Sequence, residues 1–235
     1  MKYSVIIPLK NESANILPLI AELESVMEKF KEPWELILID DGSTYETPYL
    51  LEQLARTKSY LRLFRFDKNY GQSSAFDAGF KKATGEIVLT LDGDGQNDPA
   101  DIPLLLEALK GADMVVGWRV NRKDSVGKRF ISRFSNFIRS SLCKDNVQDT
   151  GCSLKAYRRT ALSKIKLFHG LHRFLPALFV MEGFLVKQIP VNHRPRLAGQ
   201  SNYHFFNRSL GPFIDLFAVV WMHKRSLKYR FKDDV

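Results

Sequence analysis

The sequence predicts an α/β fold with a mostly parallel sheet and helices on both of its faces. Short apolar runs, such as residues 36–39, alternate along the chain with amphipathic helical patterns, which is typical of a parallel sheet covered on both sides. Acidic clusters directly follow two of these runs, at residues 40–43 and 92–95. Ligands of such sheets bind at the carboxyl ends of the strands, so both clusters are expected at a site.

The first half of the chain supplies most of the expected elements. Residues 3–9 form a β-branched run that stops near Pro8, and Ser13 is the candidate N-cap of an apolar-periodic helix over residues 16–30. The further expected strands are residues 35–39, 61–66, 86–91 and 113–117, and the further expected helices are residues 45–57, 72–83 and 101–109.

The composition changes after residue 117. Residues 118–144 are rich in Arg and Lys interleaved with phenylalanines, and residues 149–157 and 184–191 predict two more strands. Residues 210–222 are apolar and aromatic, and a basic stretch follows them. We place a boundary near residue 118 within one continuous domain. The resulting segments are residues 1–117, residues 118–209 and a basic amphipathic C-terminal segment, residues 210–235.

The overall composition indicates a folded chain with an anionic partner. Of the 235 residues, 45% are hydrophobic and 26% are charged, which is ordinary for a globular protein with one sizeable core. The net charge of +9 favours nucleic acid, anionic lipid or a phosphorylated substrate. Cys143 and Cys152 have no metal-ligand spacing and form no disulfide framework, which fits a reducing compartment. The first residues lack a signal-peptide pattern.

The two acidic clusters are the strongest candidates for chemistry. Asp92 and Asp94 stand one residue apart between glycines, and a glycine turn can bring both carboxylates to one point. Mg²⁺ and Mn²⁺ prefer such oxygen ligands and share them with phosphates. Asp40 and Asp41 follow an earlier strand, where an acid can hold a ribose or a base edge. Asp-Gly pairs also make plain turns, but two clusters at strand ends favour a ligand site.

A series of ordered segments carries a family resemblance. The segments are VIIPLKNE (5–12), LIDDGS (38–43), NYGQSSAFDAGF (69–80), LDGDGQNDP (91–99), VVGWR (115–119), DTGCSLKAYRR (149–159) and HRPRLAGQSNY (193–203). In this order they resemble family-two glycosyltransferases, most closely the polyprenyl-phosphate branch typified by dolichyl-phosphate mannose synthase. The resemblance implies the GT-A fold, a Rossmann-like sheet, and metal-dependent, inverting transfer of a sugar from a GDP- or UDP-sugar to a dolichyl or undecaprenyl phosphate.

The resemblance also implies roles for individual residues. Pro8, Asn11 and Glu12 match the first loop of the family, which contacts the nucleotide, and Asp40 and Asp41 match the residues that contact the base and the ribose. Asp92 and Asp94 match the two acids that bind Mg²⁺ or Mn²⁺, and Gln96 matches the residue that usually follows them. Arg119 matches an arginine that faces the phosphates or the donor sugar, and Arg196 and Ser201 match a segment near the donor. Arg129 and Arg133 fall where the branch keeps basic residues for the lipid phosphate.

The metal segment departs from the family pattern. Gly93 and Gly95 stand where the branch often has larger residues. They imply a looser loop and a possible change in the choice of sugar. Asn202 also stands where a lysine is common before Tyr203.

The second half of the chain favours a phosphate acceptor. A hydroxyl acceptor needs a general base, which relatives place in a Glu-Asp pair, whereas Glu182 is followed by Gly183 here. A phosphate is already ionised and needs cations, which residues 119–144 supply. Two alternatives stay open: transfer to a hydroxyl of a polysaccharide or glycolipid, and a non-catalytic module that binds nucleotide-sugar or RNA. No RNA-binding motif is found, so no nucleic-acid partner is expected.

The C-terminal segment predicts contact with a membrane surface. Trp221 lies near the end of an apolar run, and a basic cluster follows it, a pattern that suits an interface with anionic lipid. The run is shorter than a membrane span and is interrupted by Asp215. We expect a cytoplasmic protein that is peripheral on the cytoplasmic membrane face. A membrane-anchoring subunit is a further candidate partner. An ordinary buried C-terminal helix is the alternative.

Overall fold

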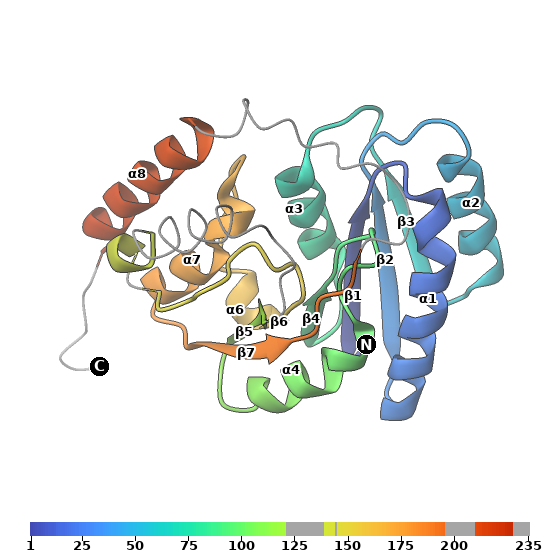
Figure 1. Cartoon of the computed structure of the whole chain (residues 1–235), viewed down its shortest axis with the longest axis horizontal. Coiled ribbons are helices and arrows are strands. Elements are labelled where there is room, and N and C mark those ends of the chain that lie inside the picture. The colour runs from blue at the N-terminus through green and yellow to red at the C-terminus, as the bar shows by residue number, and fades with distance from the viewer. Residues whose placement is uncertain (121–138, 144, 196–209, 228–235) are drawn as a thin grey trace, which may run out of the picture.

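A sheet forms the middle layer of the protein, and helices cover both of its faces (Figure 1). The computed structural model describes residues 1–120, 139–143, 145–195 and 210–227. In this part of the chain the sheet has seven strands in the order β3-β2-β1-β4-β6-β5-β7. The strands are β1 (Tyr3–Leu9), β2 (Trp34–Asp40), β3 (Leu61–Arg65), β4 (Ile87–Thr90), β5 (Met114–Arg119), β6 (Lys155–Arg158) and β7 (Val186–Val191).

The central strands are apolar on both faces because both faces are buried. In β1 the side chains of Val5 and Ile7 enter one hydrophobic cluster and Ile6 enters another, as the alternation of side chains along a strand requires. Leu36 and Ile37 of β2 divide between the same two clusters. The expected covering of both faces is therefore confirmed.

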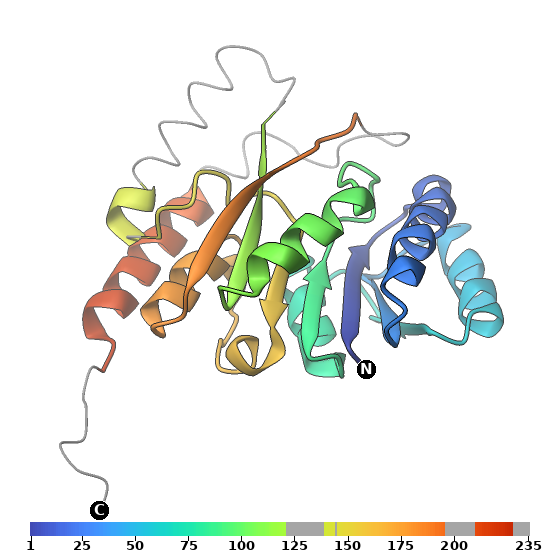
Figure 2. The same cartoon turned by 90° about the horizontal axis from the view of Figure 1, so that it is seen from below.

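Each face of the sheet has its own set of helices (Figure 2). On one face the core includes α1 (Ser13–Met27), α2 (Thr47–Thr57) and α4 (Ile102–Leu109), and on the other α3 (Gln72–Lys82), α6 (Arg159–Leu162) and α7 (Leu175–Met181). Helix α8 (Leu210–Arg225) packs against α7 through a third cluster. Short 3₁₀ helices are η1 (Glu28–Phe30), η2 (Pro99–Asp101) and η3 (Leu171–Phe174).

Strand β6 is antiparallel to its neighbours, which determines which segment lies at the carboxyl ends of β4 and β5. Strands β1 to β4 pair in parallel, as do β5 and β7. Strand β6 is antiparallel to both of its neighbours, and its first residue, Lys155, pairs with Thr90 of β4 and Val116 of β5. The segment before β6 is therefore delivered to the carboxyl ends of β4 and β5. The mostly parallel sheet that the sequence predicted is confirmed.

Several local expectations need correction. Ser13 is the first residue of α1 rather than its N-cap, since Glu12 occupies that position and makes no side-chain cap hydrogen bond. The strand expected over residues 149–157 begins only at Lys155, because the preceding residues form a turn. Strand β5 runs through the boundary placed near residue 118, which stays a prediction. The assignment of ligands to the two halves stays a prediction.

Candidate active site

A cavity of about 440 Å³ opens at the carboxyl ends of the strands. Its walls come from the loops after β1, β2 and β4, from the end of β5, from the segment before β6, and from η3. The lining residues are Pro8, Leu9, Lys10, Glu12, Asp41, Gln72, Ala75, Phe76, Asp92, Gly93, Asp94, Gln96, Arg119, Thr150, Gly151, Ser153, Lys155, His172 and Arg173. Of the polar site residues proposed from the sequence, Glu12, Asp41, Asp92, Asp94, Gln96 and Arg119 therefore lie around one cavity, whereas Asn11 and Asp40 are not among its lining residues.

Asp92 and Asp94 form an acid pair in the cavity wall. The Asp92 carboxylate accepts hydrogen bonds from Gln72 Nε2 at 2.9 Å and from the Ser153 hydroxyl. Asp94 is 8% exposed and accepts from the backbone N–H of Gln96 at 3.1 Å. Desolvation and then the neighbouring charge of Asp94 raise the pKa of Asp92 to about 6. Two repelling carboxylates in a low-dielectric wall favour a bound cation.

The loop that carries this pair depends on glycine. Gly95 has a φ of +73°, a left-handed conformation that glycine adopts without a steric cost. A Cβ at Gly93 would lie 3.1 Å from Leu9 Cβ, so this residue packs closely on the end of β1. The glycines that the sequence associated with a looser loop thus set a tight turn against the first strand.

The acid pair fits a divalent cation that shares its ligands with a substrate. Within the described part of the chain no group of three or more His, Cys, Asp or Glu side chains is arranged to hold a metal. The protein thus offers two carboxylates, with the Gln96 side chain lining the same cavity. Mg²⁺ commonly binds one or two carboxylates and completes its shell with water and substrate phosphates, which is consistent with this donor set.

Asp40 and Asp41 have different surroundings. Asp41 lines the cavity, and its two carboxylate oxygens accept from the backbone N–H groups of Tyr70 at 2.6 Å and Gly71 at 2.9 Å. Asp40 is not among the lining residues; it accepts from the Ser43 N–H at 2.9 Å and lies 3.6 Å from Arg65 Nε. Both acids thus accept hydrogen bonds from the backbone of loops around the site and stabilise these loops. Their predicted contacts with base and ribose stay predictions.

The first loop is tied to the loop after β2. The Asn11 side-chain oxygen accepts from the Thr44 N–H at 2.8 Å, and the Asn11 N–H donates to Ser43 Oγ at 3.0 Å. Asn11 has a φ of +57°, a conformation that asparagine tolerates better than most residues. Pro8 and Glu12 line the cavity on either side of it. Their contact with the nucleotide stays a prediction.

Arg119 of the cavity wall is held by the carboxylate of Asp149, which directly precedes the lining residue Thr150. Its Nε and one terminal nitrogen donate to the two oxygens of Asp149 at 2.7 and 2.8 Å. Burial alone would lower the pKa of Arg119, but the hydrogen bond and charge of Asp149 outweigh it and raise the pKa. The guanidinium is therefore fixed in position and largely neutralised.

Other residues in the cavity wall or directly beside it carry chemistry that was not assigned from the sequence. Gln72 and Ser153 hold Asp92, Asp149 holds Arg119, and Lys155 places an ammonium in the wall. All of them lie within matched segments, so position in a motif was the available signal. Arg129, Arg133, Arg196 and Ser201 lie outside the described residues, so their predicted roles stay predictions.

Comparison with known proteins identifies the family. The family described as glycosyl transferase family 2 matches residues 4–166. The chain therefore belongs to glycosyl transferase family 2, as the sequence segments predicted.

Two relatives by sequence are named for a sugar and a polyprenyl phosphate. A dodecaprenyl-phosphate galacturonate synthase of Rhizobium johnstonii is 35% identical over 94% of this chain and 67% of its own length. An undecaprenyl-phosphate 4-deoxy-4-formamido-L-arabinose transferase of Pectobacterium atrosepticum is 37% identical over 86% of this chain and 62% of its own length. The chain thus spans about two thirds of the length of these relatives. The predicted resemblance to the polyprenyl-phosphate branch is confirmed.

Solved structures with the same fold include two complexes with uridine nucleotides. Glucosyl-3-phosphoglycerate synthase from Mycobacterium tuberculosis, in complex with Mn²⁺, uridine diphosphate and phosphoglyceric acid, has a TM-score of 0.69, with 17% identity over 97% of this chain and 80% of its own. TarS of S. aureus in complex with UDP-GlcNAc has a TM-score of 0.59, with 20% identity over 95% of this chain and 66% of its own. The predicted GT-A fold is confirmed.

Proposed function

We propose that the protein is a metal-dependent, inverting glycosyltransferase that moves a sugar from a nucleotide-sugar to a polyprenyl phosphate. The observation that carries the proposal is the charge arrangement of one cavity. An acid pair, Asp92 and Asp94, lies in the same wall as two enclosed cations, Arg119 and Lys155. A diphosphate with a divalent cation fits such a site. The relatives named for polyprenyl phosphates support the acceptor.

Asp92 and Asp94 would hold Mg²⁺ or Mn²⁺, which would neutralise the charge that develops on the departing nucleoside diphosphate. Neighbouring residues hold the charged side chains of the site in position. Gln72 and Ser153 orient the Asp92 carboxylate through hydrogen bonds. Asp149 fixes the guanidinium of Arg119 beside the pair, where it can face a phosphate or the donor sugar.

The origin of the acids around the cavity is consistent with a phosphate acceptor. The lining carboxylates are Glu12, Asp41, Asp92 and Asp94, and none of them belongs to the segment around Glu182, which is the C-cap of α7. An ionised phosphate oxygen attacks the anomeric carbon as the bond to the nucleoside diphosphate breaks, and no proton has to be removed. Arg129 and Arg133 are proposed to hold this phosphate, with residues 118–209 as the acceptor half.

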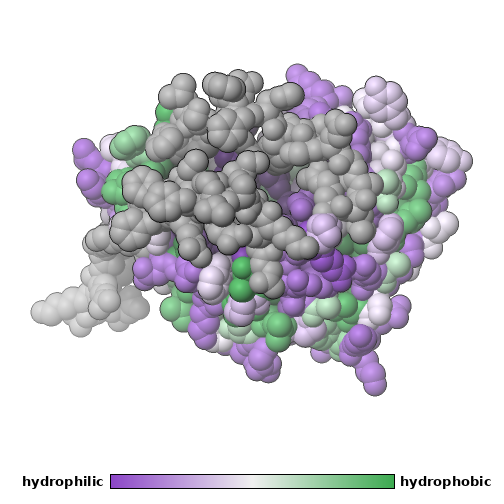
Figure 3. Space-filling view, in the orientation of Figure 1, coloured by the Kyte–Doolittle hydropathy of each residue, from purple (hydrophilic) through white to green (hydrophobic). Residues whose placement is uncertain are grey.

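Helix α8 supports a place at the membrane surface. Ile214, Phe217 and Trp221 are 66%, 68% and 63% exposed and recur at helical spacing, while Leu216 and Val219 of the same helix are buried against α7. Hydrophobic side chains are visible at the left edge of Figure 3, where α8 lies. A half-exposed apolar face followed by Lys224 and Arg225 suits anionic lipid.

We therefore propose that the protein is peripheral on the cytoplasmic membrane face, alone or with a membrane-anchoring subunit. Across the described ranges no helix is long and apolar enough to cross a membrane. Flotation with vesicles of phosphatidylglycerol and phosphatidylethanolamine tests the placement. Phe217→Ser should reduce the bound fraction severalfold relative to the matched change Leu185→Ser, which alters a residue that is 56% exposed and directly precedes β7. Equal binding of the two variants would contradict it.

The reaction is tested by radiolabelled transfer. The protein is incubated with Mn²⁺ or Mg²⁺, a panel of UDP- and GDP-sugars, and undecaprenyl or dolichyl phosphate in detergent. Label that moves into the organic phase with one donor supports the proposal and identifies the sugar. Donor binding combined with transfer only to a hydroxyl acceptor would overturn the acceptor assignment, and binding of RNA without any transfer would overturn the enzyme.

A further inference from the structure

Lys155 is an enclosed cation at the inner end of the cavity. It is 5% exposed and lines the cavity wall. As the first residue of β6 it pairs with Thr90 and Val116 at the carboxyl ends of β4 and β5. Its Nζ donates to the backbone carbonyl of Thr150 at 3.3 Å.

The ammonium has no direct ion-pair partner among the described residues, although Asp92 and Asp149 attract it from further away. Its hydrogen bond within this part of the chain goes to the Thr150 carbonyl, which carries no full charge. Removing an ammonium from water costs several kcal/mol unless a counter-charge and hydrogen bonds offset it. Burial accordingly lowers the pKa of Lys155. A single carbonyl contact leaves two of the three donors of the ammonium for another group.

The other cations of the cavity are placed differently. Arg119 already binds Asp149 through two hydrogen bonds. Lys10 and Arg173 are partly exposed, so water can solvate them. Lys155 is therefore the cavity cation that gains most from an anion inside the cavity.

We propose that the Lys155 ammonium binds a phosphate oxygen of the substrate held in this cavity. The inference rests on the proposed function, because a nucleotide-sugar and a polyprenyl phosphate both bring phosphate oxygens to the site. The position of Lys155 beside the end of β4, two residues from Asp92 in register, favours the donor diphosphate over the acceptor phosphate. Charge-assisted hydrogen bonds to phosphate are among the stronger polar contacts of proteins.

The test compares Lys155→Met with Lys110→Met, which removes a lysine with a 73% exposed side chain outside the cavity. Binding of UDP and GDP with Mn²⁺, of uridine and guanosine, and of farnesyl phosphate is measured by calorimetry. We expect Lys155→Met to lose about 10- to 100-fold in affinity for a phosphate ligand and less than about twofold for the nucleosides. Loss with UDP or GDP assigns the contact to the donor, and loss with farnesyl phosphate alone assigns it to the acceptor.

Thermal melting of the ligand-free variants provides the second readout. Replacing a buried charge that has no direct ion-pair partner by a side chain of similar length should leave the melting temperature unchanged or raised, and Lys155→Arg should restore part of the phosphate affinity. A wild-type protein that binds neither UDP nor GDP would overturn the proposed function together with this inference. Wild-type binding that Lys155→Met retains within about twofold, or a large fall in its melting temperature, would overturn this inference alone.

Discussion

A buried carboxylate, Glu35, and a partly buried one, Asp92, lie at opposite ends of the sheet and have opposite electrostatic surroundings. Glu35 lies near the amino end of β2, and Asp92 lies just after the carboxyl end of β4. The pKa of Glu35 is lowered to about 2 and the pKa of Asp92 is raised to about 6. The protein thus stabilises Glu35 as an anion, whereas burial and the charge of Asp94 disfavour the anion of Asp92.

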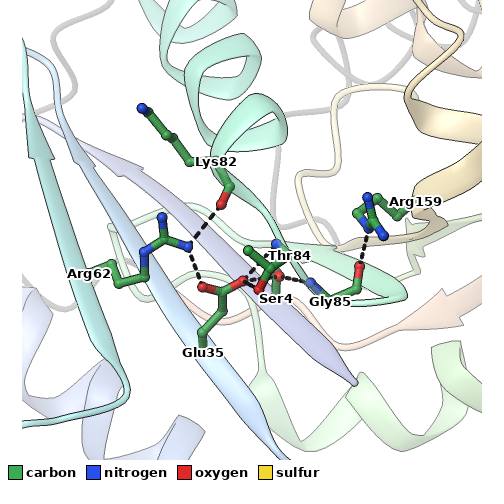
Figure 4. A network of polar contacts seen from close by, with 7 residues as sticks. All are labelled: Ser4, Glu35, Arg62, Lys82, Thr84, Gly85 and Arg159. Atoms are coloured by element: carbon green, nitrogen blue, oxygen red, sulfur yellow. Dashed lines mark hydrogen bonds and ion pairs between the residues drawn. The ribbon is translucent and has the colours of Figure 1, made fainter. Parts of the chain in front are cut away.

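The contacts of Glu35 explain its low pKa (Figure 4). Its Oε1 accepts from Ser4 Oγ at 2.6 Å and from the N–H and hydroxyl of Thr84 at 2.8 and 2.6 Å. Its Oε2 accepts from Arg62 at 2.6 Å. Burial would raise the pKa of Glu35, but these donors and the guanidinium outweigh it.

Two of the residues that bind Glu35 make further hydrogen bonds of their own. Arg62 also donates to the carbonyl of Lys82, and the Gly85 N–H donates to Ser4 Oγ at 2.8 Å. The partners come from β1, β2, β3 and the turn after α3, so they bind neighbouring parts of the sheet together. Asp92 accepts two hydrogen bonds, but burial and the charge of Asp94 outweigh the attraction of Lys155 and Arg119. The contrast indicates that the amino end is built for stability and the carboxyl end for a ligand.

The largest expected effect is the loss of transfer in Asp94→Asn. Asparagine keeps the shape of the side chain but removes the charge that a divalent cation needs. If the ion supplies several kcal/mol of transition-state stabilisation, the transfer rate should fall by about a thousandfold. Initial rates at saturating Mn²⁺ and donor check it.

The same variant should not lose stability. Removing one of two neighbouring negative charges relieves repulsion, so the free energy of unfolding of Asp94→Asn should equal or exceed that of the wild type. Urea unfolding without added metal measures it. A clear loss of stability, or transfer within tenfold of the wild-type rate, would break the contrast between the two ends.

Glu35→Gln should show the opposite pattern. The amide cannot serve as an ionised acceptor for Arg62 and the two hydroxyls, so we expect the free energy of unfolding to fall by about 3 kcal/mol. The melting temperature should then fall by roughly 6–12 °C for a chain of this size. The affinity for UDP with Mn²⁺ should stay unchanged below the unfolding transition, and a weakened affinity would show that the network also shapes the site.

The sequence was sufficient to predict the strands and the acid pair, because both leave local signals. A buried apolar run followed by Asp92, Gly93 and Asp94 needs no knowledge of distant contacts. The side chains that hold or accompany the pair were not predicted. Lys155 reaches the site only because β6 inserts antiparallel between β4 and β5, a non-local pairing that no spacing along the chain reveals.

The roles of the buried acids also depend on contacts with distant segments of the chain. Asp40 directly precedes Asp41 in sequence, yet Asp40 lies beside Arg65 of β3 and Asp41 lines the cavity. Glu35 could be taken from the sequence as an exposed strand residue. Its burial depends on Ser4, Arg62 and Thr84, which come from three other segments.

The stability supplied by Glu35 should be lost in acid. Its pKa is about 2 in the folded protein against an ordinary 4.5, so the folded state binds fewer protons than the unfolded state. The contribution is fully present above pH 4.5 and declines as the pH falls toward the folded pKa. The difference in unfolding free energy between the wild type and Glu35→Gln should therefore shrink by about 2 kcal/mol between roughly pH 7 and pH 3.

Urea titrations of both proteins across this range measure the difference directly. Asp94→Asn is the matched control for acid sensitivity, because its substitution leaves the Glu35 network intact. Its difference from the wild type should not follow the Glu35→Gln curve. A difference between the wild type and Glu35→Gln that stays constant with pH would show that the low pKa of Glu35 does not contribute to stability.

The smallest expected effects come from single hydroxyls at the two ends. Thr84→Val removes a hydroxyl that donates to Glu35 at 2.6 Å and should lower the free energy of unfolding by about 1.5 kcal/mol. Ser153→Ala removes the hydroxyl that donates to Asp92, which partly faces the cavity, where water can replace the donor. We expect a loss of stability below about 1 kcal/mol, but about tenfold weaker Mn²⁺ binding in the presence of UDP, because an oriented ligand is lost. If Ser153→Ala destabilised the protein as much as Thr84→Val and left Mn²⁺ affinity unchanged, the carboxyl end would have to be regarded as a second structural network.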